Sequence, residues 1–403
     1  MRARGCVACA VVGAVVAAGA PARAFATDYF VSTSGSNNAS GTSKDAPFKT
    51  IGRALSLVNP GDTIYVRPGT YSAAHVASRD GTAEAPIRLV GDVDGAIFGV
   101  SGAVTLSWNQ LDALVVTADY FELHNIRFAG TRIGVTWTNA SGGRMVGCTL
   151  DGCHGMNMLA NGSEVSFERS LSVDARGPGI TVGSGSRVLI TDSEVRASSH
   201  DGIVVATGGS AEVVRCDIGS NRHDGIDVQG GSAVVVSCLV SGNSNSGISV
   251  SSGSGATLAV WNSTVVSNKN SGVNAAAGTS LVKNCILTHN SNYGIRAGGA
   301  VDAGYNLYFG NKSGVVQGIT LSATDITADP LFADKARYTL DAASPAANAG
   351  TTPDVRVASD LLGRARPGGG RYDLGAYETD APTDTAVVPV RVVRWREVGA
   401  DEE

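Results

Sequence analysis

Two histidine–aspartate pairs are the residues of this sequence best suited to chemistry. His200 and Asp201 form the first pair. His223 and Asp224 form the second pair 23 residues later, and Asp227 follows closely. Carboxylates held close together raise one another's pKa unless a cation lies among them, and oxygen ligands suit Ca²⁺. Asp201, Asp224 and Asp227 are therefore candidate calcium ligands. His223 is a candidate catalytic group and His200 a candidate substrate-binding group. The alternative is a solvated acidic turn whose aspartates accept hydrogen bonds from turn amides.

Basic residues alternate with serines at the position just before these histidines. In successive repeats this position holds Arg176, Ser199, Arg222, Ser244, Lys269 and Ser291. If the repeats stack as strands do, the cations recur about 10 Å apart, which suits an acidic polymer lying along the stack. Lys269 is a candidate catalytic base if its pKa is lowered. Arg222 is a candidate catalytic residue that binds a carboxylate through two hydrogen bonds, and Arg176 is a candidate substrate-binding residue. Each is equally compatible with an ordinary surface cation.

These positions recur because the middle of the chain repeats one unit. Each unit is marked by a small residue, usually followed nine residues later by a glycine and then an apolar residue. The small residues are Cys148, Ser170, Ser193, Cys216, Cys238, Ser263 and Cys285, at spacings of 22, 23, 23, 22, 25 and 22 residues. Apolar residues alternate at a period of two, which is typical of strands with one face inward. Repetition at this period predicts a solenoid. We therefore predict an all-β, right-handed parallel β-helix with three short strands per coil, since parallel crossovers are right-handed.

Two buried columns are predicted inside the coils. Asparagines lie five residues after four of the small residues, at Asn221, Asn243, Asn268 and Asn290. Stacked about 4.8 Å apart, their amides can form an internal hydrogen-bonded ladder. Five cysteines follow the N-terminal segment, at Cys148, Cys153, Cys216, Cys238 and Cys285. Cys216 and Cys238 are neighbours that could form a disulfide, but we expect buried free thiols in a column of small side chains.

The two ends of the chain lack the repeat. Residues 6–20 are uncharged and mostly apolar and follow Arg2 and Arg4, which is typical of an export signal. Residues 48–58 carry apolar residues at helical spacing and predict an amphipathic helix. The predicted organisation is a signal peptide at 1–26, an N-terminal cap and first coil at 27–75, a parallel β-helix at 76–320, a C-terminal capping segment at 321–378 and a flexible tail at 379–403.

Composition excludes several classes of protein. The net charge of −5 argues against nucleic-acid binding, which needs a basic surface. With 52 glycines and 4 tryptophans in 403 residues, the chain suits short strands joined by tight turns. Beyond the signal peptide, no stretch is apolar enough to span a membrane. We therefore expect an exported monomer that is secreted or held at the cell surface.

The regions that flank the repeat resemble those of secreted bacterial β-helix proteins. The motifs are Pro-Gly-Asp-Thr-Ile at 60–64, Pro-Gly-Thr-Tyr at 68–71, Ala-Pro-Ile at 85–87, Ser-Pro-Ala at 344–346 and Asp-Leu-Gly-Ala-Tyr-Glu at 373–378. The resemblance extends over residues 28–378 and includes pectate lyases of family nine, alginate lyases and chondroitin lyases. It implies export, the β-helix fold and an acidic, uronate-containing polysaccharide as the substrate.

The same resemblance implies roles for individual residues. In family-nine lyases, an Asp-Asp-x-x-Asp run and an aspartate one coil earlier bind calcium. The matching run is 223–227 and the earlier aspartate is Asp201, but His223 stands where the family has an aspartate. These lyases use a lysine or arginine as the base, a role that Lys269 would fill.

Three functions remain open from the sequence. The leading hypothesis is calcium-assisted β-elimination, with the carboxylates in an open groove that Trp108 and Trp137 could border. A uronate epimerase is an alternative, because histidine beside aspartate also occurs in β-helix mannuronan epimerases, although their Asp-Pro-His-Asp motif is not intact here. A non-catalytic carbohydrate-binding or cell-surface protein is the other, because no complete catalytic motif is present.

Overall fold

The computed structural model describes residues 26–109, 111–353, 355, 357–368 and 370–379. The predicted signal peptide lies outside these residues except for Ala26, and the predicted tail lies outside them except for Thr379. Among the described residues, no helix is long and apolar enough to cross a membrane.

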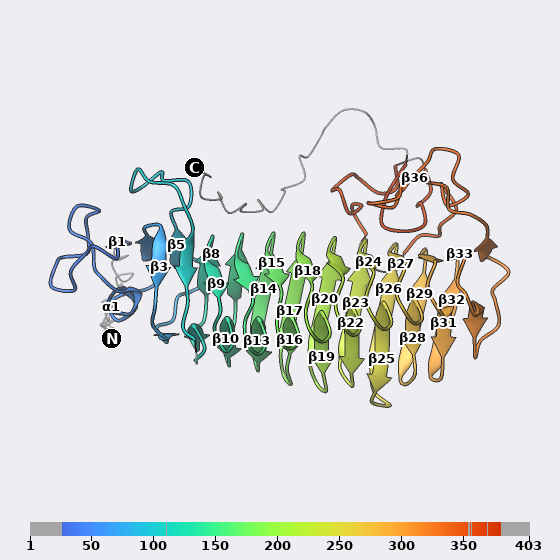
Figure 1. Cartoon of the computed structure of the whole chain (residues 1–403), viewed down its shortest axis with the longest axis horizontal. Helices are drawn as coiled ribbons and strands as arrows, with labels where there is room; N and C mark the ends of the chain where they lie inside the picture. The colour runs from blue at the N-terminus through green and yellow to red at the C-terminus, as the bar shows by residue number, and fades with distance from the viewer. Residues whose placement is uncertain (1–25, 110, 354, 356, 369, 380–403) are drawn as a thin grey trace, which may run out of the picture.

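The chain winds into a parallel β-helix, in which each coil contributes one strand to each of three long sheets (Figure 1). Sheet A consists of β1 (Asp28–Val31), β2 (Thr63–Val66), β5 (Ile87–Gly91), β8 (Phe121–His124), β11 (Gly143–Val146), β14 (Glu164–Glu168), β17 (Arg187–Thr191), β20 (Ser210–Val214), β23 (Ser232–Val236), β26 (Thr257–Trp261), β29 (Thr279–Lys283) and β32 (Ala300–Gly304). Sheet B consists of β3 (Gly69–Tyr71), β6 (Val104–Leu106), β9 (Arg127–Ala129), β12 (Thr149–Asp151), β15 (Leu171–Val173), β18 (Glu194–Arg196), β21 (Asp217–Gly219), β24 (Leu239–Ser241), β27 (Thr264–Val266), β30 (Ile286–Thr288), β33 (Leu307–Phe309) and β35 (Ile326–Thr327). Sheet C consists of β4 (His75–Ala77), β7 (Leu114–Val116), β10 (Val135–Thr138), β13 (Met158–Asn161), β16 (Ile180–Val182), β19 (Ile203–Ala206), β22 (Ile226–Gln229), β25 (Ile248–Ser252), β28 (Val273–Ala275), β31 (Tyr293–Ala297) and β34 (Gly314–Gln317). The predicted fold, with three short parallel strands per coil, is confirmed.

Alternation of apolar and polar residues explains why these segments form strands. In β20 the side chains of Ala211 and Val213 are buried, whereas Glu212 between them is exposed. Each strand pairs in parallel with the strand one coil along, so Val213 lies between Ile190 and Val235 of the neighbouring coils. Apolar side chains therefore stack into continuous columns, and the solenoid keeps one core along its whole length.

The predicted asparagine ladder is confirmed in the turn between sheets B and C. Asn221, Asn243, Asn268 and Asn290 are fully buried. The Oδ1 atom of Asn243 accepts hydrogen bonds from the backbone N–H and the Nδ2 atom of Asn221, at 3.1 and 3.0 Å. The same pair of bonds recurs down the column and continues to Asn311. The ladder thus satisfies buried turn donors that water cannot reach.

The column of small side chains between sheets A and B also matches the prediction. Cys148, Cys216, Cys238 and Cys285 are buried free thiols in this column. Ser170 and Ser193 fill the same column, where each hydroxyl accepts a hydrogen bond from the backbone of the preceding coil. Small residues are needed because the chain turns sharply here, with Arg215 at a φ of 51°. Cys153 is also a buried free thiol, but it lies in the turn between sheets B and C, after β12.

The predicted helix at 48–58 is confined to α1 (Ile51–Leu55), which begins after the N-cap residue Thr50. It cannot start earlier, because Phe48 exchanges backbone hydrogen bonds with β1 through Phe30 and Ser32. Its buried side chains face β1, β2 and β4.

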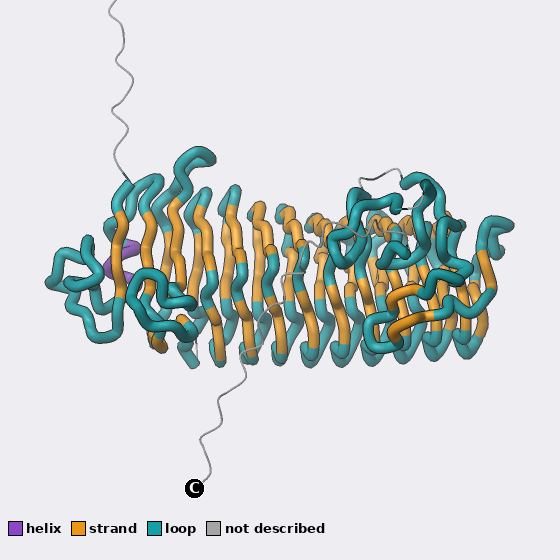
Figure 2. Tube along the Cα trace, turned by 90° about the horizontal axis from the view of Figure 1, so that it is seen from above, coloured by secondary structure: helices purple, strands orange, loops and turns teal. Residues whose placement is uncertain are grey.

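The C-terminal segment lies along the side of the solenoid rather than across its end (Figures 1 and 2). This segment includes the antiparallel strands β36 (Phe332–Asp334) and β37 (Thr339–Leu340). Its backbone carbonyls at Thr351 and Asp373 accept hydrogen bonds from Asn284 and Asn262 in the turn between sheets A and B. A fully buried ion pair within it joins Arg366 and Glu378 at 3.0 Å. The repeat could not predict that the C-terminal segment lies along the side of the solenoid, because the contacts that hold it there join residues about 100 positions apart.

Replacing Asn243 with alanine is expected to destabilise the protein by roughly 2–4 kcal/mol, because it leaves the N–H of Asn221 buried without a partner and opens a cavity. Chemical unfolding followed by circular dichroism measures the effect. The matched control is Asn245→Ala in the same coil, which removes one half-buried bond from Asn270 and should cost less than about 1 kcal/mol. Equal losses for the two variants would contradict a stabilising role for the internal ladder.

Candidate functional site

The candidate site lies in the turn that leads from sheet B to sheet C. Asp224 is followed by Gly225, which begins the approach to β22. A Cβ atom at Gly225 would lie 2.6 Å from the carbonyl oxygen of Gly247 and 2.8 Å from Nδ2 of Asn243. Glycine is therefore required for the coils to stack against the ladder. The residue before the glycine is consequently held beside the same residue of the next coil.

Asp201, His223 and Asp224 come together across two coils. Oδ1 of Asp201 is hydrogen-bonded to Nδ1 of His223 at 2.7 Å and accepts the backbone N–H of Asp224 at 2.9 Å. Oδ1 of Asp224 accepts the backbone N–H of Ser246 at 2.7 Å, and its Oδ2 lies 3.6 Å from Nδ1 of His223. One potential ligand atom from each of the three residues lies within 4.8 Å of the others. The predicted convergence of Asp201 with Asp224 is present, and so are the turn-amide bonds of the alternative interpretation.

Asp227 lies in β22 beside this cluster, and one of its oxygens has no partner. Oδ2 accepts a hydrogen bond from Nε2 of Gln229 at 2.6 Å. Oδ1 is buried and receives no hydrogen bond from the described residues. A buried carboxylate oxygen without a donor is costly, and such an atom calls for a bound cation or water. The group whose potential ligand atoms lie within 4.8 Å of one another consists of Asp201, His223 and Asp224. Asp227 is a neighbouring carboxylate whose charge raises the pKa of Asp224, and it is not a member of that group.

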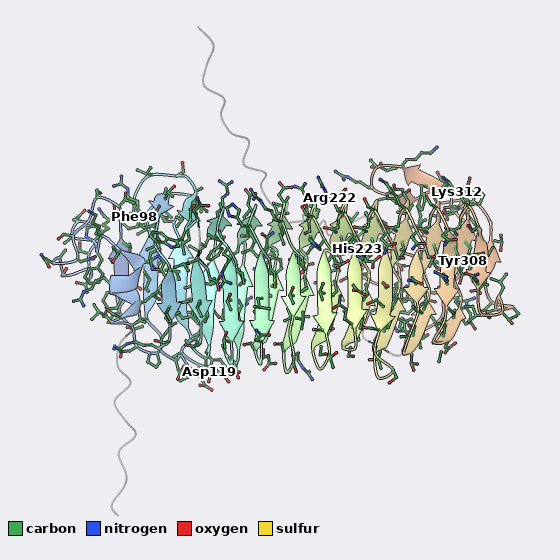
Figure 3. The ribbon with its side chains drawn as sticks, turned by 60° about the horizontal axis from the view of Figure 1, so that its bottom comes forward. Phe98, Asp119, Arg222, His223, Tyr308 and Lys312 are labelled. Carbon is green, nitrogen blue, oxygen red and sulfur yellow. The ribbon has the colours of Figure 1, made fainter. Side chains whose placement is uncertain are left out.

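The expectation of carboxylates in an open groove is wrong. Asp201, Asp224 and Asp227 are 7%, 2% and 3% exposed. The side chain of His223 is 57% exposed and forms the outer surface of the cluster (Figure 3). Asp201 and Asp224 each accept a backbone N–H group of the next coil, whereas Asp227 accepts a hydrogen bond from Gln229 of its own strand. His223 is the exposed member of the cluster.

Burial and mutual repulsion change the acidity of the cluster. Burial, followed by the charges of Asp201 and Asp227, raises the pKa of Asp224 to about 7. The hydrogen bond from the Ser246 amide and the nearby His223 lower this pKa, but by less. Burial lowers the pKa of His223, but its hydrogen bond to Asp201 and the nearby carboxylates outweigh burial and raise that pKa above its ordinary value. The cluster therefore favours a positive charge or a bound proton.

The basic residues form a straight row on the surface beside the cluster. The backbone N–H groups of this row donate to carbonyls of the preceding coil, which aligns them from coil to coil. The aligned residues are Arg176, Ser199, Arg222, Ser244, Lys269, Ser291 and Lys312. Lys312, which the sequence analysis missed, is exposed and follows Asn311 of the ladder. The extended asparagine column was the signal that could have identified it.

The structure does not bring the other candidates into the carboxylate cluster. Arg176, Arg222 and Lys269 are exposed, and Arg222 is adjacent to His223 in the chain. His200 is exposed, with Nδ1 bonded to the carbonyl oxygen of Arg176 at 3.2 Å.

Of the two tryptophans that were expected to border a groove, one is buried and the other is exposed. Trp137 is completely buried in the core as part of β10, whereas Trp108 is 38% exposed. Alternation within the strand turns Trp137 inward with Val135, so it cannot stack on a sugar.

A hollow that the sequence analysis missed lies on the outer face of sheet A. Its volume is about 630 Å³, and its lining includes Arg144, Glu164, Arg187 and Glu212. Neither Asp201 nor Asp224 lines it. Since charges of both signs alternate here and Arg144 is paired with Glu168 at 2.7 Å, the hollow has no strong preference for one charge.

An Asp224→Asn variant is expected to gain thermal stability relative to the wild type as the pH rises from about 4 to about 7 in a chelator. Because the folded pKa of Asp224, about 7, lies above its ordinary value of 3.8, the folded state binds more protons than the unfolded state in this window. Wild-type stability contributed by this group is therefore lost as the pH rises. Thermal unfolding at several pH values measures the difference in Tm, with Asp302→Asn as an exposed control. A difference that does not change with pH would contradict the raised pKa.

Comparisons with known proteins agree with the fold. A family described as "Right handed beta helix region" matches residues 133–286, and one described as "Pel9A-like, right handed beta helix region" matches residues 29–194. The second match ends before Asp201. A pectate lyase, PEL9 of Emericella nidulans, is 32% identical over 128 residues, which cover 29% of this chain and 31% of that protein. The matched segment thus spans less than a third of that relative.

Solved structures with the same architecture cover most of the chain. The crystal structure of the pectate lyase Pel9A superposes with a TM-score of 0.59 at 19% identity, covering 87% of this chain and 96% of that one. A rhamnogalacturonan lyase superposes with a TM-score of 0.50 at 16% identity, covering 82% and 96%. At these identities the likeness concerns the fold. The chain is therefore a right-handed parallel β-helix protein that resembles the polysaccharide lyases.

Proposed function

We propose that this protein is an exported polysaccharide lyase that cleaves an acidic, uronate-containing polysaccharide by calcium-assisted β-elimination. The observation that carries the proposal is the meeting of Asp201, His223 and Asp224 beside the exposed cations of the row. The neighbouring Asp227 is buried and has one carboxylate oxygen without a partner among the described residues. Three nearly buried carboxylates favour a cation by their charge, and oxygen ligands favour calcium. The apolar segment at 6–20 supports export.

The proposed calcium would use oxygens that the turn does not use. Hydrogen bonds of the turn occupy Oδ1 of Asp201 and Asp224, which leaves their Oδ2 atoms as candidate ligands, with Oδ1 of the neighbouring Asp227 as a further candidate. His223 replaces a fourth carboxylate, so it is proposed to stand at the entrance and contact the polymer. Bound calcium would neutralise a uronate carboxylate and make the neighbouring C5 proton more acidic.

The exposed cations supply the remaining chemistry of an elimination. Arg222, next to His223 in the chain, would hold a uronate carboxylate through two hydrogen bonds. Lys269, two coils further along the row, would accept the C5 proton as its neutral amine. The C5–H bond and the C4–O4 bond break, a C4=C5 double bond forms, and the leaving O4 takes up a proton. Arg176 and His200 would bind sugars on the other side of the cleavage point.

Calcium is expected to raise the Tm of the mature protein, because it binds the folded cluster and not the unfolded chain. It is also expected to support a rise in absorbance at the unsaturated-uronate band with pectate, alginate or chondroitin. Asp224→Ala should abolish both effects, whereas Asp302→Ala at an exposed ion pair with Lys283 should abolish neither. Absence of both effects with all three polymers would favour the non-catalytic carbohydrate-binding alternative.

Lys269→Ala is expected to lower kcat by roughly 10²–10⁴-fold, the usual contribution of a general base. The calcium-dependent rise in Tm should persist, because Lys269 is not a ligand. Lys335→Ala, which removes an exposed lysine of the C-terminal segment, is the matched control. Unchanged kcat in Lys269→Ala would rule out its role as the base. Altered sugar configuration in the NMR spectrum without a double bond would instead identify the epimerase alternative.

A further inference from the structure

We propose that Arg176, Arg222, Lys269 and Lys312, here called the cation row, bind a polyuronate along the solenoid axis with a period of two sugars, in which Arg176, Arg222 and Lys312 contact carboxylates and Lys269 faces the reacting sugar. This inference rests on the proposed acidic polysaccharide and adds the length and the period of its binding site. The row spans about 29 Å, since Lys312 lies six coils beyond Arg176 and coils are about 4.8 Å apart.

Backbone hydrogen bonds give the row its straight line. The N–H groups of Arg222 and Lys269 donate to the carbonyls of Ser198 and Asn243, each one coil earlier, at 2.9 Å. Lys312 donates in the same way to Asn290 at 3.0 Å. The buried ladder lies immediately before Arg222, Lys269 and Lys312, so the backbone of these three residues is held in line. Arg176 lies outside the ladder and is aligned by its own N–H group, which donates to the carbonyl of Cys153 at 2.9 Å. Figure 3 shows Arg222 and Lys312 along the same long edge of the solenoid.

The cations of the row have no anionic partner within the described chain, in contrast to several arginines elsewhere on its surface. The paired ones include Arg127 with Asp151, Arg144 with Glu168, Arg196 with Glu194 and Arg215 with Asp192. No such contact within 4.0 Å joins a described carboxylate to Arg176, Arg222, Lys269 or Lys312. Exposed cations that lie in line without an anionic partner attract a linear polyanion.

Neutral residues separate the cations and set the period. Ser199, Ser244 and Ser291 occupy the intervening coils. The adjacent column holds a second, half-buried ladder, in which Asn270 donates to Asn245 at 2.9 Å and Asn292 donates to Asn270 at 3.1 Å. These amides and hydroxyls offer hydrogen bonds to sugar hydroxyls but no charge for an acid group. A charged contact is therefore available on every second coil only.

The period of two coils identifies the chemistry of the ligand. A pyranose in an extended polysaccharide is about as long as one coil is high, so two coils correspond to two sugars. Carboxylates would then have to recur at every second sugar along one edge of the polymer. Two kinds of polysaccharide meet this requirement. One is a homopolymer of uronates with a two-fold twist, and the other is a copolymer in which uronates alternate with neutral sugars.

Calorimetric titration with oligosaccharides of defined length tests the row at low ionic strength. One arm uses homopolymeric oligouronates and the other uses alternating uronate–neutral oligosaccharides. Lys312→Gln and Arg176→Gln should each weaken binding of long oligomers about fivefold, the size expected for one exposed charge contact, and leave short oligomers unaffected. Lys335→Gln, with the same loss of charge away from the row, should bind like the wild type. The stronger-binding arm identifies the source.

Moving one cation by a single coil tests the period itself. The double variant Lys312→Ser, Ser291→Lys keeps the net charge and the line but breaks the alternation, so it should bind as weakly as Lys312→Gln. Wild-type affinity in this variant, or equal losses in Lys335→Gln and Lys312→Gln, would overturn the inference. Failure of both arms to bind would overturn it as well. The titration is run in chelator, so binding is read without the proposed calcium-assisted turnover. Absence of lyase activity with an intact two-coil period would therefore reject the proposed reaction alone.

Discussion

Satisfaction of buried backbone donors in the turn between sheets B and C governs the rest of this structure. Each coil from Ser198 onward has an N–H group that water cannot reach, and the asparagine of the next coil accepts it, as Asn243 does for Asn221. Unpaired buried donors are costly, so a slip of one residue between these coils is strongly disfavoured. The same register extends to the neighbouring positions of the turn. A surface residue of this turn is therefore one member of a column.

The carboxylate cluster is a consequence of that column geometry, and it opposes stability. Close stacking at Gly225 holds Asp224 against the coil of Asp201, where repulsion and burial raise its pKa. Later coils place serines at this position, as Ser246 and Ser271 illustrate. The position before the glycine thus holds neutral residues in these later coils and carboxylates at Asp201 and Asp224. Departures of this kind mark functional sites more often than structural ones.

Periodicity predicted the parts of the structure that depend on neighbours one coil apart. The strands, the ladder and the buried thiols belong to this group, because their partners lie at a fixed spacing in the sequence. Contacts that do not follow the repeat could not be predicted in this way. Phe48 pairs with β1 and shortens the helix, and Asp373 meets Asn262 across more than a hundred residues. The sequence likewise predicted carboxylates in an open groove, but periodicity gave no measure of how closely neighbouring residues cover Asp224 and Asp227.

The carboxylate cluster and the cation row lie in the same turn and are aligned by the same stacking of coils. The proposed metal site would hold a single carboxylate, which is too little contact to keep a flexible polymer in place. The solenoid repeats an unpaired cation on every second coil, at Arg222, Lys269 and Lys312, and these cations would extend that contact. Since the ladder that aligns these cations also positions Asp224, a reacting sugar and the distant sugars would share one register. The proposed recognition along the axis and the proposed chemistry would therefore be two uses of the same backbone constraint.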